Sequence, residues 1–266
     1  MKFTTKKAAK EFSKVSYLGT TSASAKMEKS VKINGVLTYS LYLAPYKESG
    51  YNVCSHATKE CILGCLATSG RAKMDLISGR NIIKDARVKK SRLFFEHQSL
   101  FMNWLIAEIK TAENKAKKMN YGFAIRLNGT SDIDWANVLH NDKSIFDHFP
   151  NVSFYDYTKN ASKFDTDISN YHLTLSYTGH NWNKCKTVLD NKNNVAIVFN
   201  IDKKLPLPKT FNGYKVINGD ITDLRIKDEK GIIVGLYWKK IANKELNNEV
   251  KNSIFAIQQN DQSNEF

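Results

Sequence analysis

The chain has 266 residues, of which 42% are hydrophobic and 25% charged, and its formal net charge is +14 at pH 7. This composition supplies enough apolar side chains for a folded core and excludes a chain that is disordered throughout. No apolar run approaches the roughly 20 residues that cross a bilayer as a helix, so we expect no membrane association and a cytoplasmic location. The positive charge favours a polyanionic partner, either nucleic acid or a phosphorylated ligand. A genome rich in A and T would also raise the Lys content, and Lys is spread along the whole chain.

The first half of the chain predicts a polar lead-in, a strand and a long helical stretch. Residues 1–30 are rich in Lys and Ser and predict an N-terminal arm, followed by a single α/β domain over 31–266. β-branched and aromatic residues alternate over 36–46, which predicts the first strand, with a Cys-rich loop directly after it. Residues 80–118 are helical in pattern, with Phe101, Trp104 and Ile109 on one face. A break near Ser91 or His97 is expected to divide them into two helices.

The second half alternates short apolar segments with helical ones. Strands are predicted over 123–127, 152–157, 172–177, 195–200, 214–217 and 232–238, and helices around 145–149 and 182–189. The polar tail after Asn243 is expected to be helical to about Ile257. This alternation predicts the α/β class, with a mostly parallel (β/α) barrel or partial barrel.

Polar and charged side chains follow nearly every predicted strand. A (β/α) barrel assembles its active site at the C-terminal ends of its strands, so these positions are where catalytic groups belong. The alternative for each cluster taken singly is that a strand leaving any core must enter a polar loop. We predict catalytic roles for Arg126, Asn128, Asp132, Asp156, Lys159, Asp220 and Asp223, and cofactor-binding roles for Ser131, Ser176 and Asn200.

Three of the four Cys residues, Cys54, Cys61 and Cys65, lie within twelve positions. Cytosolic thiols stay reduced, so ligand or catalytic roles are favoured over disulfides. Thiolates at this spacing suit a soft-ligand metal site, and we predict an iron–sulfur cluster of the four-iron type, with zinc as the second choice. His56 or Cys185 would be the fourth ligand of a closed zinc site. The alternative is that the Cys residues are small core side chains.

Several segments in fixed order resemble the gene product 88 family of phage proteins. They are Asn-Val-Cys at 52–54, Cys-Ile-Leu-Gly-Cys-Leu at 61–66, Arg-Leu-Asn-Gly-Thr-Ser-Asp at 126–132, Phe-Tyr-Asp-Tyr-Thr-Lys at 154–159, and Gly-Asp at 219–220 with Asp223 to Arg225. The resemblance spans roughly residues 39–238. It implies a viral origin, and therefore the host cytoplasm, and it leaves the function open.

A second similarity is architectural. Radical S-adenosylmethionine enzymes also place a three-Cys loop after the first strand of a parallel barrel, and the methionine part of the cofactor chelates the fourth iron. The resemblance implies S-adenosylmethionine as a cofactor. This chain departs from that family, because its spacing is Cys-x6-Cys-x3-Cys rather than Cys-x3-Cys-x2-Cys and no Gly-Gly-Glu follows its second strand.

Three hypotheses follow for the function. The first is a phage iron–sulfur protein, with radical S-adenosylmethionine-like chemistry as its enzymatic form. The second is a basic protein that acts on nucleic acid, such as a nickase or replication factor, with a structural metal site and carboxylates that bind a divalent ion. The third is a non-catalytic protein that binds a host component. The sequence does not define an oligomeric state.

Overall fold

The computed structural model describes residues 3, 5–66, 70–261 and 264–265. The chain forms two compact units, which are described separately. Unit 1 comprises Met1–Ser55, Gly79–Asp156 and Ile168–His172, and unit 2 comprises His56–Ser78, Tyr157–Asp167 and Leu173–Phe266.

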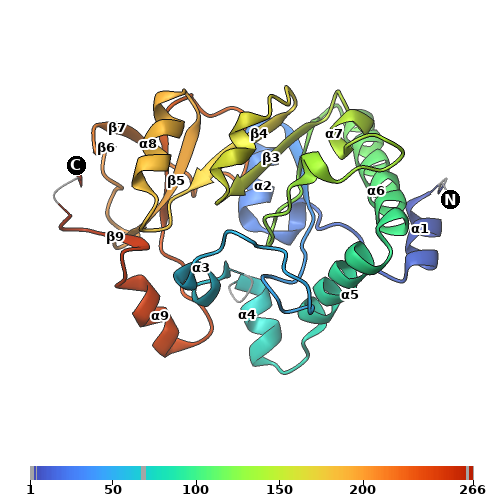
Figure 1. The fold of residues 1–266 in the computed structure, drawn as a ribbon, viewed down its shortest axis with the longest axis horizontal. Coiled ribbons are helices and arrows are strands. Elements are labelled where there is room, and N and C mark those ends of the chain that lie inside the picture. The colour runs from blue at the N-terminus through green and yellow to red at the C-terminus, as the bar shows by residue number, and fades with distance from the viewer. Residues whose placement is uncertain (1–2, 4, 67–69, 262–263, 266) are drawn as a thin grey trace. The chain divides into compact units, whose positions relative to one another are not determined.

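Unit 1 is built on parallel strands. Strand β1 (Val36–Ser40) pairs in parallel with β2 (Gly122–Arg126), and β2 pairs in parallel with the first part of β3 (Ser153–Thr158). Its helices, labelled in Figure 1, are α1 (Lys6–Ser13), α2 (Ala25–Asn34), α5 (Ile82–Glu96), α6 (Gln98–Lys118) and α7 (Ile145–His148). Short 3-10 turns lie at Thr21–Ala23 and Trp135–Asn137.

The helices of unit 1 begin and end where local chemistry favours it. The segment predicted as an arm, residues 1–30, contains α1 and most of α2, and the first turns of these helices are capped by the Thr5 and Ser24 side chains. The predicted break at His97 is confirmed, because the His97 N–H closes α5 on Leu93 O and α6 begins one residue later. The apolar face predicted for α6 is buried, with Phe101, Trp104 and Ile109 fully covered.

Unit 2 holds a longer, mixed sheet in the order β4-β5-β8-β7-β6-β10. Strands β4 (Tyr171–Ser176, from Leu173 in this unit), β5 (Asn194–Asn200), β8 (Ile233–Tyr237) and β7 (Tyr214–Asn218) are parallel. The short strands β6 (Thr210–Phe211) and β10 (Asn264–Glu265) extend the edge antiparallel. Helices α3 (Lys59–Leu63), α4 (Gly70–Ile77), α8 (Trp182–Asp190) and α9 (Lys244–Lys251) and a 3-10 turn at Ala161–Asp165 complete the unit.

The predicted α/β class with a mostly parallel sheet is confirmed, and closure into a barrel is not. In the described residues, the strand path of each unit has two ends. The tail prediction is wrong beyond Lys251: α9 ends at an Asn252 cap, and Ala256–Gln258 form strand β9, parallel to β5. Ala256 and Ile257 are buried, so packing outweighs the continuation of the helix.

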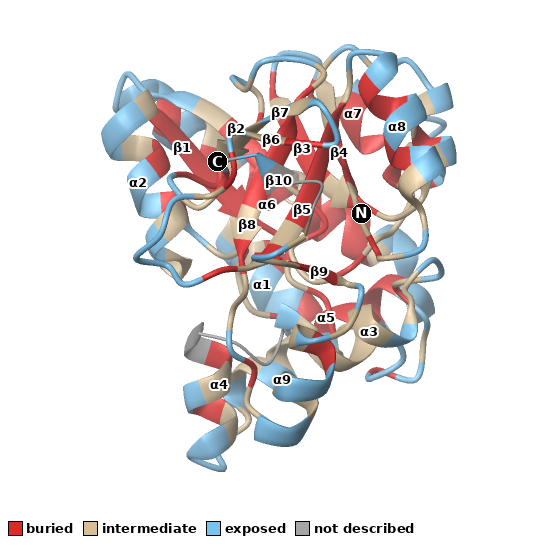
Figure 2. Cartoon of the chain, turned by 90° about the vertical axis from the view of Figure 1, so that its left-hand side faces the viewer, coloured by how far each residue is buried: buried red, intermediate tan, exposed pale blue. Residues whose placement is uncertain are grey.

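Burial follows the strands in both units. Figure 2 shows the central strands mostly buried and the outer faces of the helices exposed. The core of unit 1 centres on Phe101, Trp104, Trp135 and Phe154, and that of unit 2 on Val195, Ile197, Phe199 and Ile233. Within the described residues, no helix is long and apolar enough to cross a membrane.

Candidate functional site

A buried polar network joins the ends of β2 and β3 in unit 1. The Asp156 side chain is fully buried, and its Oδ1 accepts the Asn128 N–H at 2.6 Å. Its Oδ2 accepts the Tyr171 hydroxyl at 3.0 Å and the Asn128 amide at 3.3 Å. Burial and the Asp156 carboxylate raise the pKa of Tyr171 well above its usual value, which keeps the phenol protonated as a donor. The network therefore holds a buried negative charge with three donors.

The Asn128 side chain organises the loop that follows β2. Its Oδ1 accepts hydrogen bonds from Ser131 Oγ (2.9 Å), Ile133 N (2.9 Å) and Trp135 Nε1 (3.2 Å). Its amide also donates to Ile133 O at 3.0 Å. Asn128 thus engages both ends of its amide inside the protein, which indicates a positioning role for this residue and for Ser131.

The same loop is fastened to the segment after β1. Gly129 N donates to Leu41 O, and Thr130 Oγ1 donates to Leu43 O. A Cβ at Gly129 would lie 2.6 Å from Ser40 Oγ and 2.7 Å from Leu41 O, so only glycine allows this close approach. Half-buried Asp132 donates its N–H to Val53 O at 2.8 Å. These bonds bring the Cys54 loop and the loop after β2 together within unit 1.

Cys54 has a defined place in this arrangement. Its N–H donates to Asn52 Oδ1 at 2.9 Å, and its Sγ lies 4.0 Å from Thr130 O. The thiol is half-buried. Arg126, which ends β2, is also half-buried.

Cys61 and Cys65 belong to unit 2, on α3 and just after it. Thr58 Oγ1 caps the helix by accepting the Cys61 N–H at 3.3 Å, and the Glu60 carboxyl has a pKa below its usual value because it accepts a backbone N–H. A Cβ at Gly64 would lie 3.0 Å from Glu60 O and 3.0 Å from a Val250 methyl, so the turn after α3 packs tightly on α9. Both thiols are half-buried.

Cys185 differs from the other three. It is fully buried on α8, within the core of unit 2. Burial raises the pKa of its thiol to about 12, so it remains protonated. The interpretation of Cys185 as a core residue is supported, and a role as fourth metal ligand is disfavoured. His56 is exposed.

Three of the predicted residues of unit 2, Asn200, Ser176 and Asp220, have defined partners within that unit. Asn200 at the end of β5 donates to Gln258 Oε1 at 2.7 Å, and the Ser176 carbonyl at the end of β4 accepts from Asn181. Asp220 accepts the Tyr237 N–H at 2.9 Å and lies 3.5 Å from Lys239 Nζ. Lys159 is half-buried just after β3, and Asp223 is buried after β7.

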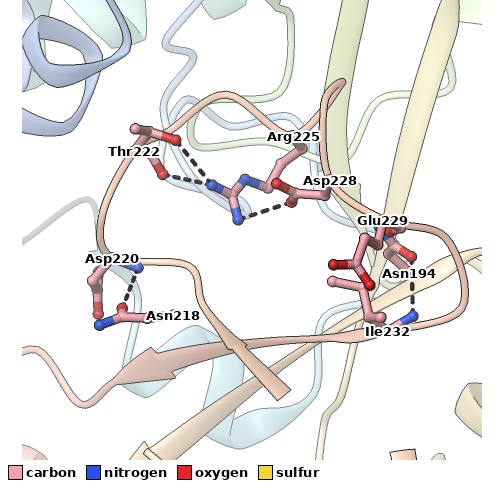
Figure 3. Close-up of polar contacts among 8 residues, drawn as sticks. All are labelled: Asn194, Asn218, Asp220, Thr222, Arg225, Asp228, Glu229 and Ile232. Atoms are coloured by element: carbon pink, nitrogen blue, oxygen red, sulfur yellow. Dashed lines mark hydrogen bonds and ion pairs between the residues drawn. The ribbon is translucent and has the colours of Figure 1, made fainter. Parts of the chain in front are cut away.

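Arg225 is the most deeply buried cation of this region (Figure 3). Its Nη2 donates to Thr222 O at 2.7 Å, and its Nη1 lies 3.1 Å from Asp228 Oδ2. Burial raises the pKa of Asp228, and the guanidinium opposes that shift. The pair is a local structural clamp on the segment between β7 and β8.

Sequence reasoning did not single out a buried ion cluster in unit 1. Glu108 is 3% exposed and Lys90 is 4% exposed. Glu108 Oε2 accepts the Leu18 N–H at 3.1 Å, and burial raises the pKa of this carboxyl. Burial lowers the pKa of Lys90 to about 8. The signal was present in the sequence, because Glu108 falls on the apolar face of α6. Tyr171 and Trp135, which complete the Asp156 network, carried no comparable signal.

No set of three or more His, Cys, Asp or Glu side chains is arranged to hold a metal ion among the residues that the structure describes. Cys54 lies in unit 1, and Cys61 and Cys65 lie in unit 2. What unit 1 brings together from the predicted site is Asn128, Ser131, Asp132 and Asp156.

The chain matches the family described as gene product 88 over residues 2–251. It therefore belongs to the gene product 88 family of phage proteins. Searches of curated proteins and of solved structures found no match. The comparisons lend no support to the similarity with radical S-adenosylmethionine enzymes.

Proposed function

We propose that this phage protein binds a metal centre through the thiolates of Cys54, Cys61 and Cys65, with an iron–sulfur cluster as its form and zinc as the alternative. The observation that carries the proposal is that the four thiols differ in how far they are buried. The three clustered ones are partly exposed, whereas Cys185 is buried with a raised pKa. Cys used as a small core residue is usually fully buried. Cys54 packs against the edge of the unit 1 core, but it keeps part of its surface exposed, as do Cys61 and Cys65, and this favours a ligand role.

The local structure around each thiol supports the proposal. Cys54 sits on a loop fixed by backbone bonds from Val53 to Tyr46 and from Asp132 to Val53. Cys61 lies within the capped helix α3, and Cys65 follows the Gly64 cap at its end. Metal ligands need this kind of support, because a loose ligand shell lowers affinity. The proposal depends on spacing along the chain and on the exposure of each thiol, not on how the units are arranged.

Three thiolates fit an iron–sulfur cluster with one open iron, or zinc with a fourth ligand from elsewhere. A bound cluster would supply electron transfer or a Lewis-acidic iron for a further ligand. Close to the Cys54 thiol lies the Thr130 carbonyl, at 4.0 Å, in the loop that Asn128 organises. Reduced thiols require a reducing compartment, so the proposal places the protein in the host cytoplasm.

The test is purification without oxygen, followed by analysis of iron, sulfide and zinc and by an absorption spectrum. Wild-type protein is expected to hold metal, and single Cys→Ser variants at positions 54, 61 and 65 should each lose most of it. Cys185→Ala is the matched control and should keep the metal. Protein that stays metal-free after anaerobic reconstitution, with all four thiols reduced, would overturn the proposal.

A further inference from the structure

An aromatic pair projects from the surface of unit 1 at the end of α5. The Tyr51 and Phe95 rings are stacked, with centroids 4.6 Å apart and planes within 9° of parallel. Phe95 also meets the edge of buried Phe94 at 4.9 Å, which fixes the pair to the core. Yet Phe95 is 38% exposed, an unusual state for a Phe on a helix that has a buried face.

The position of the Tyr51 ring is also fixed. Its hydroxyl donates to Glu96 Oε1 at 3.2 Å. Desolvation and the Glu96 carboxylate raise the pKa of Tyr51, and the Arg92 guanidinium opposes this shift. The guanidinium therefore lies near the phenol. Arg92 Nε also donates to Ser49 O at 3.4 Å, which ties α5 to the loop that carries Tyr51. The pair is therefore ordered before any ligand arrives.

The charges around the pair are mainly positive. Helix α5 carries five Lys and Arg residues, of which Lys90 is buried, against two acidic ones, Asp85 and Glu96. Lys84, Lys89 and Arg92 are exposed. Nearby Glu48 forms an ion pair with Lys84, with 3.4 Å between Oε1 and Nζ. The Glu96 carboxylate accepts the hydrogen bond from the Tyr51 hydroxyl. Lys47 extends the positive surface, with its ammonium 5.5 Å from the Tyr46 ring centroid.

We propose that the surface formed by Tyr51, Phe95, Arg92, Lys89 and Lys84 binds single-stranded nucleic acid, with a base stacked on the aromatic pair and the backbone phosphates on the cations of α5. A flat, preordered π-face beside exposed cations is what base stacking and phosphate contact require. A duplex keeps its bases stacked on each other, so the aromatic pair gives no advantage there.

The experiment measures binding of a labelled oligothymidylate of about 15 nucleotides to the full chain by fluorescence anisotropy, across a series of salt concentrations. Phe95→Ala is expected to weaken binding about tenfold, within the range for loss of one stacked base. Arg92→Ala should weaken it less and reduce the salt slope by roughly one phosphate contact.

Tyr121→Ala is the matched control, because Tyr121 has the same 38% exposure, lies in the same unit and follows the Lys-rich end of α6. It should leave the affinity unchanged. Circular dichroism of each variant checks that the fold is intact. The proposal is overturned if wild type does not bind at low salt, if Phe95→Ala and Tyr121→Ala weaken binding equally, or if a duplex of the same length binds as tightly.

Discussion

The polar cluster at the ends of β2 and β3 in unit 1 and the cluster after β7 in unit 2 both bury charge, but they satisfy it differently. Asp156 is fully buried and accepts three hydrogen bonds from Asn128 and Tyr171. Arg225 in unit 2 donates to Thr222 O through Nη2 and pairs with Asp228 through Nη1, while its Nε lacks a hydrogen-bond partner among the described residues. A buried ion with a complete set of partners stabilises a fold, whereas a partly satisfied one contributes little.

The polar residues that follow strands also have different structural roles in the two units. In unit 1, Asn128 and Asp156 draw the loop after β2 onto β3 and onto the Cys54 loop. In unit 2, Asp220 and Arg225 each serve the few residues around them. The clustering of polar residues after strands therefore has a shared structural function in unit 1 and only local functions in unit 2.

The largest expected effect is that of Asp156→Ala. This variant removes a buried carboxylate and leaves the Asn128 N–H and the Tyr171 hydroxyl without their acceptor. The free energy of unfolding of unit 1 should fall by about 3–4 kcal/mol. Urea denaturation monitored by Trp fluorescence measures it, because Trp135 belongs to the network. A loss below about 1 kcal/mol would show that the network is not the support that its geometry indicates.

The pH dependence of the free energy of unfolding tests a second buried ionisable residue in unit 1, Lys90. Burial lowers the pKa of Lys90 from 10.5 to about 8, so between these values the unfolded chain binds the proton that the folded chain has released. Lys90 should therefore contribute a rise in stability with pH across this window, of about 2 kcal/mol relative to a variant without it, since each pKa unit is worth about 1.4 kcal/mol and relaxation reduces the sum. Lys90→Met should abolish the rise. The same slope in both proteins would contradict the assignment.

The Arg225–Asp228 pair of unit 2 should matter less than Asp156. Arg225→Met removes a partly satisfied cation but leaves Asp228 buried alone, so we expect a loss of about 1–2 kcal/mol. The double variant Arg225→Met with Asp228→Asn removes both charges and should recover most of that loss. Thermal unfolding of both variants provides the measurement. If the double variant is as unstable as the single one, the pair stabilises unit 2 more than its geometry indicates.

Much of the fold was predictable, because strands and helices with strong periodicity were placed within a few residues. The break at His97 and the strands near 123–127 and 195–200 are examples. Two departures were the N-terminal segment, where α1 and α2 were not predicted, and the tail, where Ala256 and Ile257 pair with β5 although the pattern before them is helical. Such a pairing depends on a distant strand and leaves no local signal.

The candidate site was predictable in part. Asn128, Ser131 and Asp156 were identified from their positions after strands, and the structure brings them together. Their donors Tyr171 and Trp135 were not, because a buried Tyr or Trp looks the same in sequence whether or not it donates a hydrogen bond. Glu108 could have been found, since a carboxylate on an apolar helix face must be buried or break the pattern.

The smallest expected effect concerns the support of α3. Lys59 Nζ lies 3.6 Å from Glu249 Oε1 across α3 and α9, but the two side chains are 76% and 53% exposed. Water and salt screen such a pair, so Lys59→Ala should change the stability of unit 2 by less than about 0.5 kcal/mol.

Gly64→Ala is the informative comparison. The added Cβ would press on Glu60 O and Val250, and the variant should lose about 1–3 kcal/mol of stability. Both are measured by thermal unfolding, with metal content determined in parallel. If packing at Gly64 holds α3 in place, Gly64→Ala should also lower metal content at Cys61 and Cys65, and Lys59→Ala should not. Equal effects of the two variants would mean that the ion pair, rather than the close contact, positions the helix.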